Sequence, residues 1–339
     1  MADPSTDLPP LIGESTAFLE VMEAVSLAAP LNRPALVIGE RGTGKELIAA
    51  RLHFLSARWG RPLIKVNCAA LPETLLETEL FGHEAGAFTG AVRRRMGRFE
   101  RADGGSLFLD EIANASQAVQ EKILRVVEYG EMERVGGSEA VKVDVRVIAA
   151  TNVDLPGEAA AGRFRLDLLD RLAFEVLTIP PLRHRPDDIP LLAGYFARAM
   201  AMELGWDAFP GFTPAASAAL AAYTWPGNIR EIKNVAERAV YRWPDEEAPI
   251  DHIQFDPFAS PYRPASASGE DEPIERPQSS NLHEAMGQFE AGLLERALEA
   301  NRFNQRATAR HLGLSYDQLR NRLRKYGMIN TNAQKSRSA

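Results

Sequence analysis

Cysteine is almost absent from this chain of 339 residues, in which Cys68 is the only one. A single cysteine excludes an internal disulfide and is typical of a reducing compartment. The six histidines are scattered, without the spacing of a metal site. No stretch approaches the roughly 20 apolar residues that a membrane-spanning helix needs. The first ten residues are polar and proline-rich, unlike a secretion signal, so we expect a cytoplasmic protein.

Positive charge is also in deficit, because 39 Lys and Arg stand against 46 Asp and Glu, a net charge of −7. Taken whole, this balance argues against nucleic-acid binding, but the charge is unevenly distributed. From Leu282 onward there are ten Lys or Arg and five Asp or Glu, a net charge of +5. The preceding residues hold 29 basic and 41 acidic side chains, a net charge of −12. This asymmetry indicates an acidic body joined to a basic module that binds nucleic acid.

Short apolar runs alternate with helical patterns before residue 180. Strand-like runs lie at 35–38, 63–66, 106–109, 145–149 and 174–177, with helical stretches such as 45–56 and 118–129 between them. Buried strands alternating with helices predict a parallel sheet flanked by helices. Residues 186 to about 242 are helical in pattern only, and the proline-rich segment 256–281 has no apolar periodicity. We therefore predict a tail at 1–10, an α/β subdomain at 11–180, an α-helical subdomain at 181–255, a linker at 256–281, a DNA-binding domain at 282–328 and a tail at 329–339.

Residues 39–46 read GERGTGKE, follow an apolar strand and open a helix, which is the context of a phosphate-binding loop. Backbone N–H groups of such a loop point at phosphate oxygens, and the helix N-terminus adds partial positive charge. Lys45 is expected to reach the β and γ phosphates, whereas Glu46 stands where Ser or Thr normally ligates Mg²⁺. The alternative is a glycine-rich turn that merely caps a helix. The predicted nucleotide contacts here are Gly39, Glu40, Arg41, Gly42, Thr43, Gly44, Lys45 and Glu46.

The apolar run 107–109 ends in two acids, Asp110 and Glu111. Carboxylates at the C-terminal edge of a parallel strand lie where a doubly wound sheet binds ligands. We predict that Asp110 is the Mg²⁺ partner and that Glu111 is the base that orients and polarises the attacking water. The alternative is a strand exit with solvated acids. Together the two motifs predict an α/β fold of the AAA+ P-loop ATPase class, with ATP and Mg²⁺ as its ligands.

The basic C-terminal module has the pattern of three helices. An amphipathic helix is predicted at 284–300, a second at 304–312 ending at Gly313, and a third from the capping box of Ser315 and Gln318 to Tyr326. Two short helices with arginines on the second predict an all-α helix-turn-helix domain, against the alternative of a bundle with a solvated basic face. The candidate DNA contacts are Ser315, Tyr316, Gln318, Arg320, Asn321 and Arg324.

Residues 86–91 read GAFTGA, in which two glycines and three small residues surround Phe88. A phenylalanine on such a flexible loop is unexpected unless it tucks back onto the protein or meets a partner. The motif resembles the signature loop of the bacterial enhancer-binding activators of sigma-54 RNA polymerase, and the resemblance extends over about residues 8–328. It implies that Gly86, Ala87, Phe88, Thr89, Gly90 and Ala91 engage sigma-54.

The same resemblance implies roles for other residues of the ATPase. Asn67 would couple Glu111 to the nucleotide state, Thr151 and Asn152 would form the first sensor, and Arg230 would belong to the second. Alternatively, Asn67, Thr151 and Asn152 only satisfy backbone groups at strand ends.

Arg165 and Arg171 match arginine fingers, which act on a neighbouring subunit and therefore imply a hexamer. The competing view is an ion pair within one helix, such as Asp167 with Arg171. The resemblance further implies a Fis-type C-terminal domain that dimerises on enhancer DNA.

In this sequence the ATPase comes first and is followed by a linker and a Fis-like end. Within the family, this domain order is most similar to that of the activators of phage shock operons. This similarity implies a negative regulator resembling phage shock protein A, a lower oligomer under inhibition and Trp59 as a docking residue, unless Trp59 merely packs. Two alternatives for the whole chain are an AAA+ chaperone or DNA motor, and a non-catalytic DNA-binding repressor.

Overall fold

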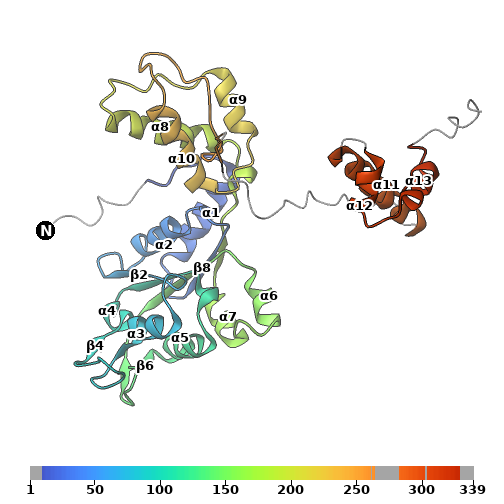
Figure 1. Cartoon of the computed structure of the whole chain (residues 1–339). Helices are drawn as coiled ribbons and strands as arrows, with labels where there is room; N and C mark the ends of the chain where they lie inside the picture. The colour runs from blue at the N-terminus through green and yellow to red at the C-terminus, as the bar shows by residue number, and fades with distance from the viewer. Residues whose placement is uncertain (1–9, 261, 264–281, 302–303, 329–339) are drawn as a thin grey trace, which may run out of the picture. The chain divides into compact units, whose positions relative to one another are not determined.

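The computed structural model describes residues 10–260, 262–263, 282–301 and 304–328. The chain divides into two compact units, Met1–Pro257 and Phe258–Ala339 (Figure 1). Outside the described residues lie the predicted tail at 329–339, residues 1–9 of the predicted tail at 1–10 and most of the predicted linker. Within those described ranges, no helix is both long and apolar enough to cross a membrane.

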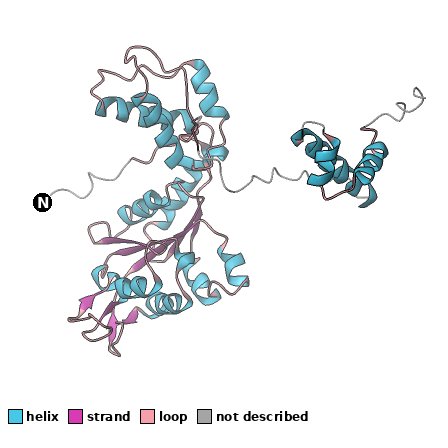
Figure 2. Ribbon diagram, viewed as in Figure 1, coloured by secondary structure: helices cyan, strands magenta, loops and turns pink. Residues whose placement is uncertain are grey.

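A five-stranded parallel sheet forms the centre of the first unit and confirms the predicted fold class (Figure 2). Its order is β2-β5-β8-β1-β9. The strands span Leu63–Asn67 (β2), Ser106–Asp110 (β5), Arg146–Thr151 (β8), Ala35–Ile38 (β1) and Val176–Thr178 (β9). Because all strands run in one direction, their C-terminal ends, and with them the P-loop and Asp110, meet at one edge.

Alternation along the strands sends neighbouring side chains to opposite faces of the sheet. Leu107 and Leu109 pack in one cluster with helices α3 (Glu73–Phe81), α5 (Gln117–Tyr129) and α7 (Leu166–Leu172). Phe108 and Ile148 pack in another with α1 (Thr16–Ala28) and α2 (Lys45–Phe54). Burial on both faces explains why the strands read as continuous apolar runs.

Several elements were not predicted. They are helix α1, helix α4 (Arg98–Arg101), helix α6 (Leu155–Ala160), the 3-10 turns Ile112–Asn114 and Leu182–His184, and two antiparallel pairs, β3 (Gly82–His83) with β4 (Arg95–Met96) and β6 (Glu131–Glu133) with β7 (Ala140–Lys142). The strands of these pairs are two or three residues long, which is too short for an alternating pattern to show in the sequence.

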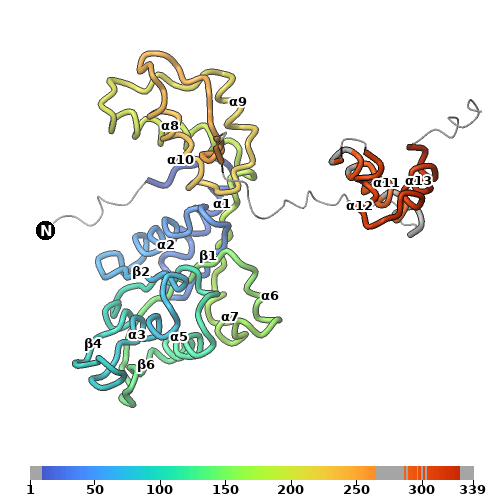
Figure 3. Tube along the Cα trace, in the orientation of Figure 1, coloured from blue at the N-terminus to red at the C-terminus, as the bar shows by residue number. Residues whose placement is uncertain are grey.

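Helices α8 (Asp188–Glu203), α9 (Pro214–Ala222) and α10 (Asn228–Tyr241) form the smaller α-helical part of the first unit. Figure 3 traces the chain into this part from β9. Its core contains Trp225, which is fully buried and donates its indole N–H to Leu220 O at 2.9 Å. Trp225 and Asn228 both have left-handed φ, at 52° and 50°, which marks the turn into α10 as a strained segment.

The second unit contains helices α11 (Leu282–Ala300), α12 (Gln305–His311) and α13 (Tyr316–Lys325). Leu319 and Leu323 are fully buried against Leu294 and Leu298, with Leu314 packed beside them. The capping box forms as expected, because Ser315 Oγ accepts from Gln318 N at 3.2 Å and Gln318 Oε1 accepts from Ser315 N at 2.9 Å.

We predict that Leu107→Ala destabilises the first unit by about 2–5 kcal/mol, because it leaves a cavity beneath the strand that carries Asp110. Leu27→Ala is the matched control, since Leu27 is 72% exposed and its loss should cost about 0.5 kcal/mol or less. Urea unfolding followed by circular dichroism measures both. Equal midpoints for the two variants would contradict this description of the core.

Candidate functional site

The P-loop lies between β1 and α2 and owes its shape to glycines. Gly42 and Gly44 have φ of 80° and 98°, a region that side-chain-bearing residues rarely adopt. Gly42 also lies against the turn into α10, where an added Cβ would stand 2.3 Å from Gly227 O. The loop therefore requires glycine at this position both for its conformation and for its contact with the α-helical part.

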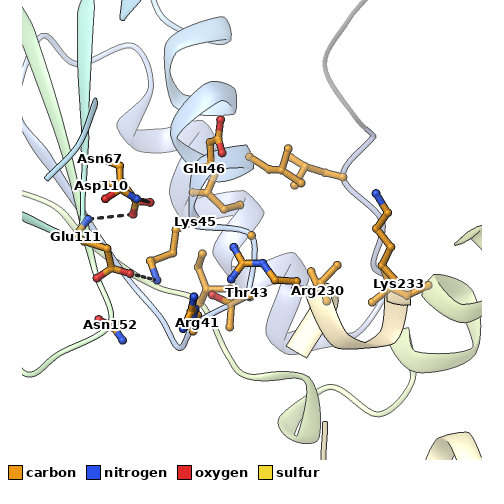
Figure 4. Close-up of a pocket in the computed structure, with 18 of the residues that line it drawn as sticks. Arg41, Thr43, Lys45, Glu46, Asn67, Asp110, Glu111, Asn152, Arg230 and Lys233 are labelled. Atoms are coloured by element: carbon orange, nitrogen blue, oxygen red, sulfur yellow. Dashed lines mark hydrogen bonds and ion pairs between the residues drawn. The ribbon is translucent and has the colours of Figure 1, made fainter. Parts of the chain in front are cut away.

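Lys45 begins helix α2, and its side chain is almost fully buried. Its Nζ donates to Gly39 O at 3.0 Å and lies 3.7 Å from Glu111 Oε1 (Figure 4). The ammonium group is thus held between the P-loop backbone and the acid at the end of β5, where the phosphates of a nucleotide would compete with Glu111 for it.

Asp110 and Glu111 lie side by side at the end of β5, and Glu111 has a left-handed φ of 52°. Asp110 accepts from Asn67 Nδ2 at 3.2 Å and from Glu111 N at 3.0 Å. The amide of Asn67 is therefore hydrogen-bonded to Asp110 rather than to Glu111. Burial, followed by the charge of Glu111, raises the pKa of Asp110 above its ordinary value.

Cys68 directly follows Asn67 and is buried. Burial, with the charges of Asp110 and Glu111 adding to it, raises the pKa of its thiol to about 12.

The carboxylates of Asp110 and Glu111 are suited to a Mg²⁺ ion whose remaining ligands come from the substrate. No group of three or more His, Cys, Asp or Glu side chains that could hold a metal occurs in the described part of the chain. Mg²⁺ typically takes one or two carboxylates and completes its shell with water and phosphate oxygens, so Asp110 beside Glu111 fits it. Glu46 is engaged elsewhere, because its Oε1 accepts from Lys65 Nζ at 2.9 Å.

A pocket of about 1110 Å³ joins these residues. Predicted site residues that line it are Arg41, Gly42, Thr43, Gly44, Lys45, Glu46, Asn67, Asp110, Glu111, Asn152 and Arg230. Figure 4 shows the acids and Lys45 grouped together, with Arg230 and Lys233 on helix α10. Thr151 is fully buried in β8 and accepts from Val153 N through Oγ1 at 3.2 Å, and Gly39 and Glu40 also lie outside the lining.

The far part of the pocket is apolar and was not predicted. It is lined by Leu11, Ile12, Ile179, Leu192, Tyr195 and Phe196. Such a surface suits the flat base of a nucleotide, whereas the P-loop side suits its phosphates. These residues come from three separated segments, so no local motif in the sequence marks them. Lys233 was also missed, although it lies one helical turn after Arg230 and faces the same pocket.

Asn228 connects the P-loop to the α-helical part and was likewise missed. Its fully buried side chain accepts from Leu182 N at 2.8 Å and donates to Arg41 O at 3.1 Å and Glu40 Oε2 at 3.2 Å. Ile229 N adds a bond to Gly42 O at 2.9 Å. Arg183, and then Asn228, lower the pKa of Glu40 by hydrogen bonding to its carboxylate. We name this set of contacts the Asn228 latch.

Arg165 and Arg171 do not line the pocket of their own chain. Arg165 pairs with Asp167, Nη2 to Oδ2 at 2.7 Å, and Arg171 Nη2 lies 2.6 Å from Glu128 Oε1. The alternative pair of Asp167 with Arg171 is therefore replaced by two other pairs. Both arginines are partly exposed, which leaves them accessible to a neighbouring subunit.

The GAFTGA loop is on the surface. Phe88 is 47% exposed, while its ring contacts His83 edge-on with centroids 5.0 Å apart. Gly86 N donates to Ala91 O at 2.8 Å, which closes the loop at its base. Thr89 and Gly90 at the tip are exposed, and Ala91 is buried. Residues 86–90 are thus outside the core, and only the end of the loop is anchored.

In the second unit the basic residues of α13 fall into two groups. Arg322 and Lys325 both interact with Glu290 of α11. Arg320 and Arg324 have no ion pair with any described residue, and with exposed Tyr316 and Asn321 they remain candidates for DNA contact. Ser315 and Gln318 are used in the capping box.

Three family profiles match the chain in order. They are the sigma-54 interaction domain at residues 11–178, the AAA+ ATPase lid domain at 183–267 and the bacterial regulatory protein, Fis family, at 285–326. The chain is 56% identical over 317 residues to the Psp operon transcriptional activator of Escherichia coli, covering 93% of this chain and 97% of that protein. The chain belongs to the sigma-54-dependent transcriptional activators.

Other relatives of this activator are longer than it is. The transcriptional regulatory protein ZraR of Klebsiella oxytoca is 54% identical over 230 residues, and the match spans 52% of its length. The crystal structure of NtrX from Brucella abortus in complex with ATP superposes with a TM-score of 0.68 at 33% identity, covering 94% of this chain and 70% of that one. The activator therefore joins an AAA+ nucleotide-binding domain to a DNA-binding helix-turn-helix.

We predict that Asn228→Ala weakens ATP binding. The change leaves Leu182 N–H and Arg41 C=O without their partner, and a buried polar group left unpaired costs about 1–3 kcal/mol. Calorimetric titration with ATP measures the affinity. Asn32→Ala is the control, because Asn32 is exposed and accepts only from Arg58 Nε. ATP affinity equal in both variants would contradict a role of the Asn228 latch in shaping the P-loop.

Proposed function

We propose that this activator hydrolyses ATP to remodel closed complexes of sigma-54 RNA polymerase and open promoters, in particular those of phage shock genes. The observation that carries the proposal is that the first unit holds Lys45, Asp110 and Glu111 in one pocket and displays the GAFTGA loop at its surface. The likeness to the Psp operon activator supports the choice of genes.

In the hydrolytic step, P-loop N–H groups and Lys45 bind the phosphates while Arg230 approaches them from α10. Glu111 polarises a water whose oxygen attacks the γ phosphorus, and the bond to the bridging oxygen breaks to give ADP and phosphate. Asp110 is the residue that would hold Mg²⁺, and the ion would supply neutralisation of the developing charge. Asn152 orients water near the γ phosphate, with Thr151 fixing the strand end before it.

Arg165 and Arg171 complete the site of a neighbouring subunit in a hexamer. An arginine supplied in trans stabilises charge on the transferring phosphoryl group. In the single chain these side chains are paired with Asp167 and Glu128, so assembly requires an exchange of partners. Breaking these pairs costs little free energy, because both lie at the surface and exposed ion pairs contribute about 0–1 kcal/mol to stability.

Coupling from the pocket to sigma-54 begins at β5. Asn67 and Asp110 are hydrogen-bonded, and Glu111 shares a contact with Lys45. When the phosphates bind the Lys45 ammonium group, Glu111 loses its ion pair with Lys45. The Asn67 amide then changes its hydrogen-bond partner, and this change shifts the elements that carry Phe88 and Thr89. Gly86 and Gly90 let the loop rise, while Ala87 and Ala91 remain at its base.

The remaining contacts of this cytoplasmic regulator are with DNA and a negative regulator. Tyr316, Arg320, Asn321 and Arg324 of the Fis-type domain bind enhancer DNA. Trp59 is 59% exposed, which suits docking of a regulator resembling phage shock protein A that favours a lower oligomer. An exposed tryptophan flanked by Arg58 and Gly60 has the character of an interface anchor.

We predict that Glu111→Gln lowers the ATPase rate by roughly 10²- to 10⁴-fold, because the amide cannot act as general base. ATP affinity is retained, since Lys45 keeps its P-loop partners. Glu131→Gln is the control, because Glu131 lies on the β6–β7 pair, where its Oε1 is 3.8 Å from Lys142 Nζ. Phosphate release measures the rate. Hydrolysis at the control level in Glu111→Gln would refute the assignment.

We predict that Thr89→Ala hydrolyses ATP but fails to open promoters, because the loop tip loses its hydroxyl while the pocket is unchanged. In vitro transcription from a sigma-54 promoter, with ATP and with a non-hydrolysable analogue, measures opening. Thr74→Ala, an exposed threonine on α3, is the matched control. Normal open-complex formation by Thr89→Ala would remove the loop from the mechanism.

A further inference from the structure

A basic groove adjoins the GAFTGA loop. It has a volume of about 770 Å³, and its lining includes Gly90 of the loop, His83 and the arginines Arg93, Arg94, Arg95 and Arg101. No aspartate or glutamate is among the described residues that line it. We name it the arginine groove. It stands out because the chain before Leu282 carries 29 basic and 41 acidic residues.

The acidic neighbours of the groove are already occupied. Arg134 Nη1 lies 2.9 Å from Glu84 Oε1, and Arg134 Nη2 lies 2.5 Å from Glu100 Oε2. Arg94 reaches the same two glutamates only at 3.9 and 4.0 Å.

Glu79 is likewise shared between two arginines, because Arg95 and Arg98 lie 3.0 and 2.9 Å from it. Three carboxylates therefore face more arginines than they can neutralise.

Arg93 and Arg101 form the uncompensated part. Both are exposed and make no ion pair with any residue in the described ranges. Guanidinium groups match phosphate oxygens in geometry and give up their hydration more readily than ammonium groups. An open groove with several such groups and no carboxylate is suited to a phosphate backbone.

The groove and the loop are physically continuous. His83 lines the groove, contacts Phe88 with its ring, and lies opposite Arg95 in the β3–β4 ladder. A loop that reaches sigma-54 on a promoter therefore brings the groove to the same DNA. We propose that the arginine groove binds the phosphate backbone of promoter DNA while the GAFTGA loop engages sigma-54, an inference that rests on the proposed function.

The test compares full-length Arg93→Ala/Arg101→Ala with Arg51→Ala/Arg198→Ala. The control pair removes the same charge from exposed arginines on α2 and α8 that have no ion pair within the described part. Thermal melting checks that both fold. Each protein, loaded with ADP–aluminium fluoride, is titrated with sigma-54 alone and with sigma-54 holoenzyme on a promoter duplex without enhancer sites, between about 50 and 200 mM KCl.

We expect the groove variant to match the control on sigma-54 alone. On the promoter complex it should bind more weakly, with the slope of log affinity against log salt reduced by about 1.8, roughly 0.9 for each lost phosphate contact. An equal loss on sigma-54 alone would assign the groove to an acidic protein surface and overturn the proposal, as would no loss on either. If the wild type failed to capture sigma-54 alone, the proposed function itself would fall, and the groove proposal with it.

Discussion

The contact between the P-loop and the turn into α10 is the constraint on which the rest of the first unit depends. Gly42 approaches Gly227 so closely that no side chain fits between them, and Asn228 bonds to Glu40, Arg41 and Leu182 around that point. The phosphate-binding loop thus has one wall made by its own strand and helix and another made by the α-helical part. Because Arg230 and Lys233 lie on the same helix as Asn228, the position of the loop and the positions of two cations near the phosphates are fixed together. Strain at Trp225 and Asn228, both with positive φ, is held in place by complete burial.

Two further sets of contacts lie in the first unit, one at the acids at the end of β5 and one at the surface loop. Lys45, Glu111, Asp110 and Asn67 are joined by ion pairing, adjacency and hydrogen bonding. At the loop, His83 packs on Phe88, and Glu84, next in sequence, is bound by Arg134. These contacts are polar or aromatic, so the loop movement proposed above requires no disruption of the apolar clusters of the sheet. The apolar clusters on the two faces of the sheet supply the rigid support against which this movement occurs.

The sequence predicted the fold class because each of its signals is local. Continuous apolar runs gave the parallel strands, glycines with Lys45 gave the P-loop, and Ser315 with Gln318 gave the start of α13. Features made by residues far apart in the chain were not predictable from spacing. The Asn228 latch joins residues 40 and 228, and the apolar end of the pocket is built from three segments. Asp167 pairs with Arg165 rather than with its helical neighbour Arg171, because the Arg165 guanidinium binds both carboxylate oxygens of Asp167. Counting charges along the chain indicated one basic region, at the C-terminus. The count did not reveal the arginine groove, because the residues before Leu282 are acidic in total.

The single thiol of the chain has a practical consequence. Cys68 is buried next to Asp110, and burial raises the pKa of its thiol to about 12, so the thiol is protonated near neutrality. Since only the thiolate reacts rapidly with electrophiles and disulfides, we expect the buried thiol of the folded protein to react slowly with such reagents. We therefore expect fluorophores or spin labels to react preferentially with a cysteine introduced at an exposed position, with the native residue left in place.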